Sequence, residues 1–431
     1  MRHNITRFII SLLLITIFIT VSSGSMYTSQ SSAQSASKPL ALQTEAVAKN
    51  TSGTYSKLSL TFIGDLLMHS PQRKSGYNAA TNSYNFDYFF KDVKKYFKNK
   101  DFVFGTLETP VDKLASDRAY TGYPCFRNPS EYLAAINNSG INVLATANNH
   151  TFDQYTSGIL ATMKWLNYYK IPATGTFRTA KEREQNPVLF LNKNNIKLAF
   201  TSYTQISNIK VPASSEYMLN LINLDKIKKD ISFAKSKKAD VIIIWLHFGT
   251  EYQRQPTPYQ KNIVQKIAEL GADVIIGSHP HVLEPMNVLE VGKRKVFVAY
   301  SLGNFISNQY WRYSTDGLIL NMDIEKKNGK INFLRNITYI PTAVIREYSG
   351  PVKLTDKVIK SMQDHDILTY DSRIKRSDVK YRVVAVEEAL ENYKTKVDKK
   401  LTANDVIRLK TTLSDTMSIL GKSQYFKPMT R

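Results

Sequence analysis

The sequence predicts an α/β fold: a layered sandwich of mixed β-sheets flanked by helices, followed by a small, mostly helical C-terminal appendage. From about residue 57 onward, short apolar runs rich in β-branched residues alternate with amphipathic helical stretches, which is typical of layered α/β domains. Apolar residues make up 42% of the 431-residue chain, which is enough to build a sizeable core. The chain is therefore not disordered throughout.

Several apolar runs are predicted to form strands. They are Ser59–Ile63, Phe102–Gly105, Val143–Thr146, Lys197–Tyr203, Val241–Leu246, Val274–Ile276 and Lys295–Tyr300. The best-marked helix follows the run that ends at Leu246. Thr257 can cap this helix, Pro258 suits its first turn, and Gly271 can end it. Its apolar face consists of Ile263, Val264, Ile267 and Leu270.

The N-terminal residues have the composition of an export signal. Arg2 and Arg7 flank the start of the apolar run Phe8–Val21, so residues 1–26 are predicted to be a signal peptide or an N-terminal membrane anchor. Residues 27–56 are mostly Ser, Thr, Gln and Ala, which predicts a flexible linker. The folded part is therefore expected at the extracytoplasmic face of the cell membrane, or secreted if the signal is cleaved.

The remaining residues are predicted to form two parts. Residues 57–347 contain all the predicted strands and form the main domain. Residues 348–431 are richer in charged, periodic stretches and are predicted to be a C-terminal helical extension, with helices at Val386–Tyr393 and Ala403–Leu413.

Charge and cysteine content narrow the classes of partner and site. The 58 Lys and Arg residues exceed the 36 Asp and Glu residues by 22, so the surface should attract anionic polymers. The positive charge is spread along the chain without a recognisable nucleic-acid module, so nucleic acid is not an expected partner. With Cys125 as the only cysteine, a metal ion must be held by His, Asp, Glu or Asn.

Polar side chains gather in the turns that follow the predicted strands. They are His69, His150, His247, His279, His281, Asp65, Glu108, Asn148, Asn149, Asp153, Glu251 and Asn304. The carboxyl ends of strands in an α/β sheet share one edge, so these residues are expected to converge there. The strongest element is His279-Pro280-His281, because two neutral imidazoles on a fixed bend can chelate a divalent ion. No phosphate-binding glycine loop, dinucleotide fingerprint or nucleophile elbow is present in the sequence.

The motifs together resemble the CapA family, the poly-gamma-glutamate capsule biosynthesis proteins, whose main domain is similar to the calcineurin-type metallophosphoesterase fold. The resemblance spans roughly Leu58 to Gln309. It is carried by Gly64-Asp65, Glu108 to Pro110, Phe126 to Pro129, Ala147 to Asp153, His247 to Tyr252, His279 to Pro285 and Tyr300 to Phe305.

The resemblance implies a role for each of the candidate residues. The metal ligands it implies are Asp65, Glu108, Asn149, His247, His279 and His281. His150 matches the imidazole that acts on the leaving group, and Asp153 is placed with it as catalytic. Arg127, Glu251 and Asn304 are expected to bind the substrate. The cofactor is expected to be a divalent metal, Mn, Zn, Fe or Mg, as one or two ions.

Three positions depart from the metallophosphoesterase pattern. Leu67 stands where the pattern Asp-x-His has its histidine, Glu108 stands where an Asp is usual, and Thr106 stands where relatives of CapA have Asn. Two functions remain open from the sequence. The first is a non-catalytic role in the biosynthesis, export or retention of a polyglutamate capsule, together with the membrane subunits and ligase of that machinery. The second is a metal-dependent hydrolase of phosphoesters or of polyglutamate amide bonds.

Overall fold

The computed structural model describes residues 54–309, 312–347 and 379–429. The predicted signal or anchor, residues 27–53 of the predicted linker and residues 348–378 of the predicted extension lie outside the described residues. Within the part that is described, none of the helices has both the length and the apolar character needed to cross a membrane.

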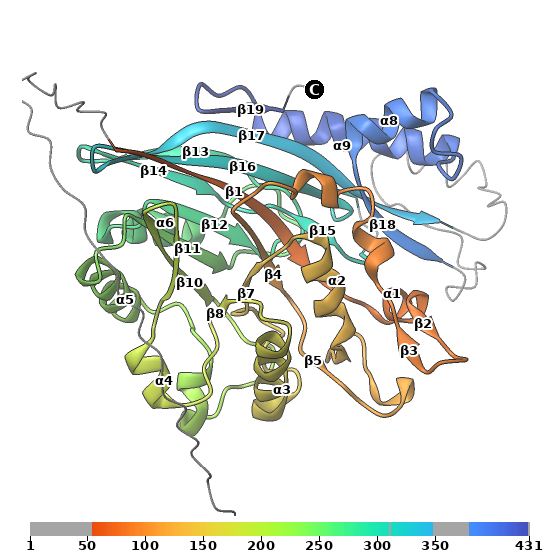
Figure 1. Ribbon diagram of the computed structural model, residues 1–431, viewed down its shortest axis with the longest axis horizontal. Coiled ribbons are helices and arrows are strands. Elements are labelled where there is room, and N and C mark those ends of the chain that lie inside the picture. Colours follow the sequence, from red (N-terminus) through yellow and green to blue (C-terminus); the bar gives the residue numbers. More distant parts are fainter. Residues whose placement is uncertain (1–53, 310–311, 348–378, 430–431) are drawn as a thin grey trace, which may run out of the picture. The chain divides into compact units, whose positions relative to one another are not determined.

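The described chain builds two β-sheets that pack face to face, with helices on their outer sides (Figure 1). The first is a nine-stranded mixed sheet with the order β18-β17-β16-β1-β4-β7-β8, in which β15 also pairs with β1 and β19 with β17. Its strands are β1 (Tyr55–Leu66), β4 (Phe102–Leu107), β7 (Val143–Ala145), β8 (Ala173–Thr174), β15 (Asn304–Ile306), β16 (Asp316–Lys327), β17 (Lys330–Glu347), β18 (Lys380–Ala385) and β19 (Phe426–Pro428).

The second sheet has six strands in the order β13-β14-β12-β11-β10-β9. They are β9 (Leu189–Lys193), β10 (Ile196–Thr204), β11 (Val241–His247), β12 (Val274–Ser278), β13 (Met286–Val291) and β14 (Arg294–Ala299). Two small two-stranded sheets pair β2 (Tyr77–Asn78) with β3 (Ser83–Tyr84), and β5 (Val111–Asp112) with β6 (Asn128–Pro129).

The helices surround these sheets. The α-helices are α1 (Ser70–Ser75), α2 (Glu131–Ser139), α3 (Tyr155–Tyr168), α4 (Ala180–Gln185), α5 (Leu224–Ser236), α6 (Pro258–Leu270), α8 (Val386–Lys394) and α9 (Ala403–Leu420). The 3₁₀-helices are η1 (Asp87–Phe90), η2 (Lys94–Tyr96), η3 (Asp117–Ala119) and η4 (Ala213–Met218). The predicted fold class, a mixed α/β sandwich flanked by helices, is confirmed.

The core between the two sheets is built from alternating side chains of their facing strands. Phe62 on β1 stacks on Phe104 of β4 with ring centroids 4.9 Å apart. Phe104 meets Phe200 of β10 edge-on at 5.0 Å, and Phe200 lies 6.5 Å from Trp245 of β11. All four rings are buried, and each contributes roughly 2–3 kcal/mol through the apolar area removed from water. This aromatic contact fixes the distance between the sheets.

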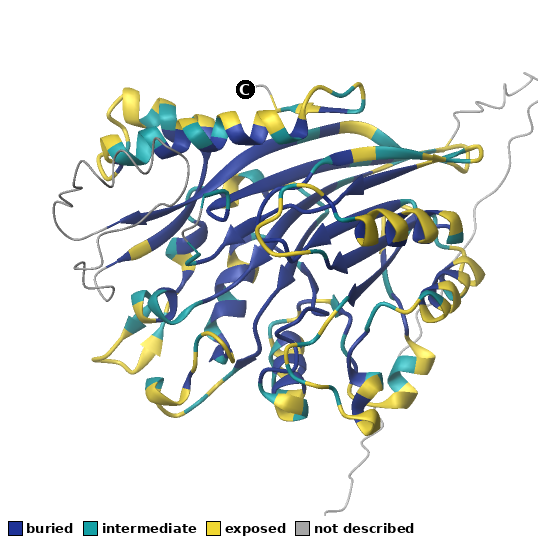
Figure 2. Cartoon of the chain, turned by 180° about the vertical axis from the view of Figure 1, so that it is seen from behind, coloured by how far each residue is buried: buried dark blue, intermediate teal, exposed yellow. Residues whose placement is uncertain are grey.

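The outer face of each sheet is covered by helices. Helices α5 and α6 cover the second sheet, and α2 with η1 covers the first. Figure 2 shows the result, with strands mostly buried and the outer sides of the helices exposed. Helix α6 has the predicted ends: Thr257 accepts a hydrogen bond from the amide of Gln260 at 3.2 Å, Pro258 begins the helix, and Gly271 ends it.

The C-terminal region contributes strands as well as the two predicted helices. Helices α8 and α9 form close to the predicted positions and pack on β17 and β18. Strands β18 and β19 were not predicted from the sequence. Nor was the long hairpin of β16 and β17, whose ends carry charged residues instead of an unbroken apolar run. The hairpin turn is Asn328-Gly329, and both residues have positive φ, as a tight two-residue turn requires.

A buried carboxyl group joins α9 to the first sheet and makes stability depend on pH. Asp316 on β16 accepts hydrogen bonds from the hydroxyls of Thr412 (2.7 Å) and Thr315 (3.0 Å). Burial raises the pKa of Asp316 from its usual 3.8 to about 6. The folded protein therefore binds this proton more tightly than the unfolded chain does, so stability is lost as pH rises from about 4 to about 6.

We expect the variant Asp316→Asn to remove this dependence, because its amide cannot ionise. The free energy of unfolding of the wild type should fall by at most about 3 kcal/mol across that pH range relative to the variant, since one pKa unit is worth about 1.4 kcal/mol. Urea unfolding of both proteins at pH 4, 5, 6 and 7 measures the difference. Parallel pH profiles for the two proteins would contradict the assignment.

Candidate metal centre

The predicted site residues converge where the carboxyl ends of strands from both sheets meet. In the first sheet, Asp65 pairs in register with Thr106 of β4 and with Asn304 of β15. In the second sheet, His247 pairs with Ser278. The sequence predicted a shared edge within one sheet, whereas the structure assembles the site from two sheets packed together.

Two glycines allow the close approach of backbone segments next to the site. A Cβ atom on Gly64 would lie 1.8 Å from the carbonyl oxygen of Gly303, and one on Gly277 would lie 1.8 Å from that of Tyr300. No other residue fits at either position without moving the neighbouring backbone. Because Gly64 precedes Asp65 directly, the position of this carboxylate depends on that close contact.

Three residues at the site have a left-handed backbone, which is uncommon for residues other than glycine. They are His279 (φ 97°), His281 (φ 59°) and Tyr252 (φ 64°). Such conformations cost of order 1–3 kcal/mol each and concentrate at functional sites. Here they turn the two histidines of the His279-Pro280-His281 bend toward the other candidate ligands.

One group of candidate ligands consists of Glu108, His247 and His279, whose ligand atoms lie within 4.8 Å of one another. His247 Nε2 is 3.3 Å from Glu108 Oε1 and 2.9 Å from Asn149 Oδ1. The rings of His247 and His279 have centroids 4.8 Å apart. The side-chain oxygen of Asn149 therefore lies against one member of this group.

A second group consists of Asp65, Glu108 and His281, again within 4.8 Å of one another. His281 Nδ1 is 3.4 Å from Asp65 Oδ2, and His281 Nε2 is 3.6 Å from Glu108 Oε1. Glu108 thus belongs to both groups, so its carboxylate could contribute to holding an ion in either of them. Five of the six ligands implied by the resemblance lie in these two groups, and the sixth, Asn149, contacts His247.

The residues fit a divalent cation. Both carboxylate oxygens of Asp65 and of Glu108 are buried and lack a hydrogen-bond donor, and so does Nδ1 of His279. Burial of a carboxylate without hydrogen-bond donors is costly, and a bound cation would add to the positive charge that the neighbouring imidazole of His281 offers. Oxygen and imidazole nitrogen are suitable ligands for Mn, Zn and Fe.

The surroundings shift the pKa values of these groups strongly. Burial raises the pKa of Glu108 to about 8 and lowers that of His247 to about 3, so His247 is neutral and can donate a lone pair. Burial also lowers the pKa of His279. Burial alone would lower the pKa of His281, but the neighbouring carboxyl groups of Glu108 and Asp65 raise it to about 10.

Hydrogen bonds behind the rings orient two of the histidines. Ser278 Oγ lies 3.0 Å from His247 Nδ1 and accepts a hydrogen bond from Trp245 Nε1 at 2.9 Å. Asn304 Oδ1 lies 3.0 Å from His281 Nδ1. When Nδ1 donates to these oxygens, Nε2 keeps its lone pair for a metal, which is the usual arrangement around metal-binding histidines.

His150 and Asp153 form a pair beside the ligands. His150 Nδ1 lies 2.7 Å from Asp153 Oδ2, which also accepts a hydrogen bond from the amide of Phe126 at 2.7 Å. The Phe126 ring contacts the His150 ring edge-on, with centroids 4.6 Å apart. Asn208 Nδ2 lies 3.4 Å from His150 Nε2. An imidazole held in this way by a carboxylate suits proton transfer.

The three residues predicted to bind substrate have different surroundings. Arg127 is partly exposed and pairs with Asp112 at 2.7 Å. Glu251 is exposed in the loop after β11. Asn304 is only 1% exposed and lies behind His281. Its side chain contacts the ring of His281 and the carbonyl oxygen of Ser314.

Some residues at the site were not assigned from the sequence. The ring of His69 lies edge-on to the ring of Phe126, with centroids 5.2 Å apart, and the Phe126 ring also contacts His150. Burial lowers the pKa of His69 to about 3. Ser278 belongs to the Gly277-to-His281 turn, so its position beside the two histidines of that turn could have predicted that it lies at the site. Asn208 lies in no recognisable motif, and only the tertiary structure brings it to His150.

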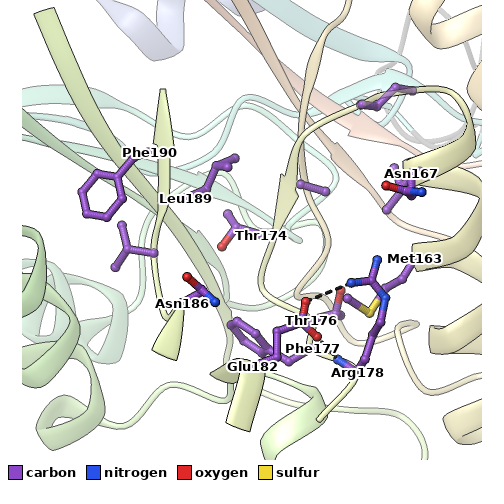
Figure 3. Close-up of a pocket in the computed structure, with 14 residues that line it drawn as sticks. Met163, Asn167, Thr174, Thr176, Phe177, Arg178, Glu182, Asn186, Leu189 and Phe190 are labelled. Carbon is purple, nitrogen blue, oxygen red and sulfur yellow. Dashed lines mark hydrogen bonds and ion pairs between the residues drawn. The ribbon is translucent and has the colours of Figure 1, made fainter. Parts of the chain in front are cut away.

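A separate cavity of about 380 Å³ lies between α3, α4, β8 and β9 (Figure 3). Arg178 and Glu182 form an ion pair of 3.1 Å among its lining residues. None of the residues of the two ligand groups lines this cavity. It is therefore distinct from the metal centre.

Two packed sheets flanked by helices, with carboxylates and imidazoles gathered at their common end, define an α/β protein with a candidate metal centre. The family can be stated more narrowly. A model of the bacterial capsule synthesis protein family PGA_cap matches residues 59–309, and this chain belongs to that family. The resemblance to CapA proteins found in the sequence is thereby confirmed.

Similar proteins of known name include two from Bacillus. The capsule biosynthesis protein CapA of Bacillus anthracis is 31% identical over 285 residues, which is 64% of this chain and 66% of that protein. The PGA biosynthesis protein CapA of Bacillus subtilis (strain 168) is 26% identical over 292 residues, or 65% of this chain and 71% of that protein. The matched region is thus just under two thirds of the length of the first relative.

Two solved structures are also similar to this chain, at low sequence identity. NAD nucleotidase (NadN) of Haemophilus influenzae is 15% identical, with a TM-score of 0.41, covering 80% of this chain and 68% of that chain. The calcineurin-like phosphoesterase YfkN of Bacillus subtilis is 12% identical, with a TM-score of 0.36, covering 85% of this chain and 99% of that chain.

Single substitutions should separate the two ligand groups. His279→Ala removes a ligand from the first group only, and His281→Ala from the second only, so we expect each variant to lose part of the bound metal and the double variant to lose all of it. Glu108→Gln should weaken both. Elemental analysis of the purified full-length chain after incubation with Mn or Zn measures the metal content.

Glu290→Gln serves as the matched control, because Glu290 is an exposed carboxylate on β13. Its metal content should equal that of the wild type. Urea unfolding shows whether each variant still folds. Unchanged metal content in a folded His279→Ala, His281→Ala double variant would refute the site.

Proposed function

We propose that this chain acts at the extracytoplasmic face of the cell membrane in the biosynthesis, export or retention of a poly-gamma-glutamate capsule, and that it binds the anionic polymer at the metal centre. One observation carries the metal-dependent part of this proposal. The carboxylates of Asp65 and Glu108 are buried without donors and share their pocket with three imidazoles. The capsule part rests on membership of the PGA_cap family and on the relatives named CapA.

Two ions would be held unequally. Glu108, Asn149, His247 and His279 offer four ligands to one ion, whereas Asp65, Glu108 and His281 offer three to the other. The second position has one ligand fewer because Leu67 stands where a histidine is usual in metallophosphoesterases. We infer that the four-ligand position binds its ion more tightly. A bound divalent ion supplies Lewis-acid stabilisation of negative charge on the ligand or substrate.

The charge of the chain supports a polyanionic partner. The net charge of +22 favours association with polyanions at neutral pH. Arg127, one third of whose side chain is exposed, offers a guanidinium for a carboxylate of the polymer. The partners proposed with this role are the membrane subunits and the ligase of the polyglutamate machinery, and the apolar run Phe8–Val21 supports a location at the membrane.

A second candidate function is favoured by the pair of His150 and Asp153. This pair has the geometry of an oriented acid or base, with 2.7 Å between His150 Nδ1 and Asp153 Oδ2. His150 Nε2 is then the atom that would give a proton to a leaving group. The corresponding activity is the hydrolysis of a phosphoester or of a polyglutamate amide bond.

A capsule assay tests the proposed role. In a host that makes the polymer and lacks its own copy of this gene, we expect the wild-type chain to restore surface polyglutamate and the His279→Ala, His281→Ala double variant to fail, because it cannot hold the metal. Surface polymer is measured by immunostaining or by chemical analysis of washed cells. Full restoration by a double variant that contains no metal would contradict a metal-dependent role.

The two functions differ in whether the polymer is cut. We expect the purified full-length chain to bind polyglutamate without shortening it, and to lose this binding when a chelator removes the metal. Gel filtration of the polymer after incubation with the chain and Mn measures both effects. Chelator-sensitive shortening of the polymer, or turnover of a chromogenic phosphodiester, would favour the hydrolase, and His150→Gln should then reduce the rate by about 10²–10⁴-fold with metal retained.

A further inference from the structure

Helix α9 lies outside the matched family region and yet contacts a loop of the metal centre. Asp415 on α9 accepts two hydrogen bonds from Arg312, from Nη2 at 2.9 Å and from Nε at 3.3 Å. The carbonyl oxygen of Asp415 accepts a third from Nη2 of Arg254 at 2.6 Å. The side chains of Arg312 and Asp415 are only 19% and 12% exposed, so water screens their ion pair incompletely.

Both arginines also lie over the ring of Tyr313. The guanidinium carbon of Arg254 is 4.1 Å from the ring centroid, and that of Arg312 is 4.6 Å from it. Cation–π contacts of this kind contribute most when the groups are partly shielded from water. Asp415 of α9 therefore holds together two segments that are distant in sequence, one around Arg254 and one around Arg312.

The segment of Arg254 is hydrogen-bonded to the bend that carries two metal ligands. The amide of Tyr252, two residues before Arg254, donates to the carbonyl oxygen of Pro280 at 2.8 Å. Pro280 stands between His279 and His281. The ring of Tyr252 also lies 6.2 Å from the ring of His281. Movement of this loop would therefore displace the bend directly.

A second connection runs through side chains. Tyr252 Oη accepts a hydrogen bond from Gln309 Nε2 at 3.2 Å, and Gln309 Oε1 accepts one from Asn304 Nδ2 at 2.9 Å. Asn304 Oδ1 lies 3.0 Å from His281 Nδ1. This series of contacts begins at the loop fixed by α9 and ends on the ring of a metal ligand.

We propose that Asp415 is a positioning residue of the metal centre: its carboxylate holds Arg312, which together with Arg254 packs on Tyr313, and this cluster fixes Tyr252 against the His279-Pro280-His281 bend and thereby sets metal affinity. This inference rests on the proposed metal centre. It gives helix α9, which the family model does not cover, a direct part in the site. Contacts behind metal ligands typically change metal affinity by about 10- to 100-fold when they are lost.

The test compares two variants of the same helix in the full-length chain. Asp415→Ala removes the carboxylate that holds Arg312 and keeps the backbone carbonyl that binds Arg254, whereas Thr412→Ala removes the hydrogen bond to Asp316 one turn earlier and leaves both arginines untouched. We expect Asp415→Ala to weaken Mn binding by about 10- to 100-fold. Thr412→Ala should retain wild-type affinity. Calorimetric titration with Mn measures affinity, and the absorption spectrum of bound Co reports ligand geometry.

Further variants separate positioning from a general loss of stability. Arg254→Ala removes both its hydrogen bond to α9 and its contact with Tyr313, so it should weaken Mn binding at least as much as Asp415→Ala does. Asp415→Glu keeps the carboxylate and should restore part of the affinity. Urea unfolding should show a comparable loss of stability for Asp415→Ala and Thr412→Ala. If Asp415 had a purely structural role, the two variants would then have equal affinities for the metal.

The outcomes are distinguishable. Wild-type Mn affinity and an unchanged Co spectrum in a folded Asp415→Ala variant would overturn the positioning role and leave the metal centre standing. Equal weakening in Asp415→Ala and Thr412→Ala would also overturn it, because both would then act through stability alone. A wild-type chain that binds neither Mn nor Co would overturn the proposed metal centre and this inference together.

Discussion

Two buried carboxylates without hydrogen-bond donors are the constraint on which the rest of the site depends. Asp65 and Glu108 are 0% exposed, and neither side chain receives a hydrogen bond. Burial raises the pKa of Glu108 to about 8, and the two carboxyl groups raise the pKa of His281 to about 10, so positive charge is favoured beside them. The three histidines of the two ligand groups, two of them in an uncommon backbone conformation, are arranged around these two carboxyl groups.

The packing of the two sheets holds these buried groups in place. The apolar core between the sheets, with its contacts from Phe62 to Trp245, keeps the ends of the two sheets at a fixed separation. Asp65 comes from the first sheet and His247 from the second, so their distance is set by how the sheets pack and not by either strand alone. The close backbone contacts at Gly64 and Gly277 then define the positions of Asp65 and His279.

The site extends beyond the region that defines the family. Residues 59–309 supply the metal ligands, but the loop of Tyr252 is held by Arg254, which reaches α9. The cavity between α3 and β9 is separate from this network and shares none of its residues.

The sequence by itself determined the fold class, most of the strands that carry the site and the candidate ligands in the turns after them, because buried strands and these turns have local signatures, as in Val241 to His247 and Gly277 to His281. It did not reveal the hairpin of β16 and β17, whose charged ends hide the strand pattern. Only the tertiary structure decided that two sheets share the site, that Glu108 belongs to both ligand groups, and that Asn208 and Asp415 reach it. These contacts join residues far apart in the chain, and their distances are set by packing between layers, which no local pattern encodes.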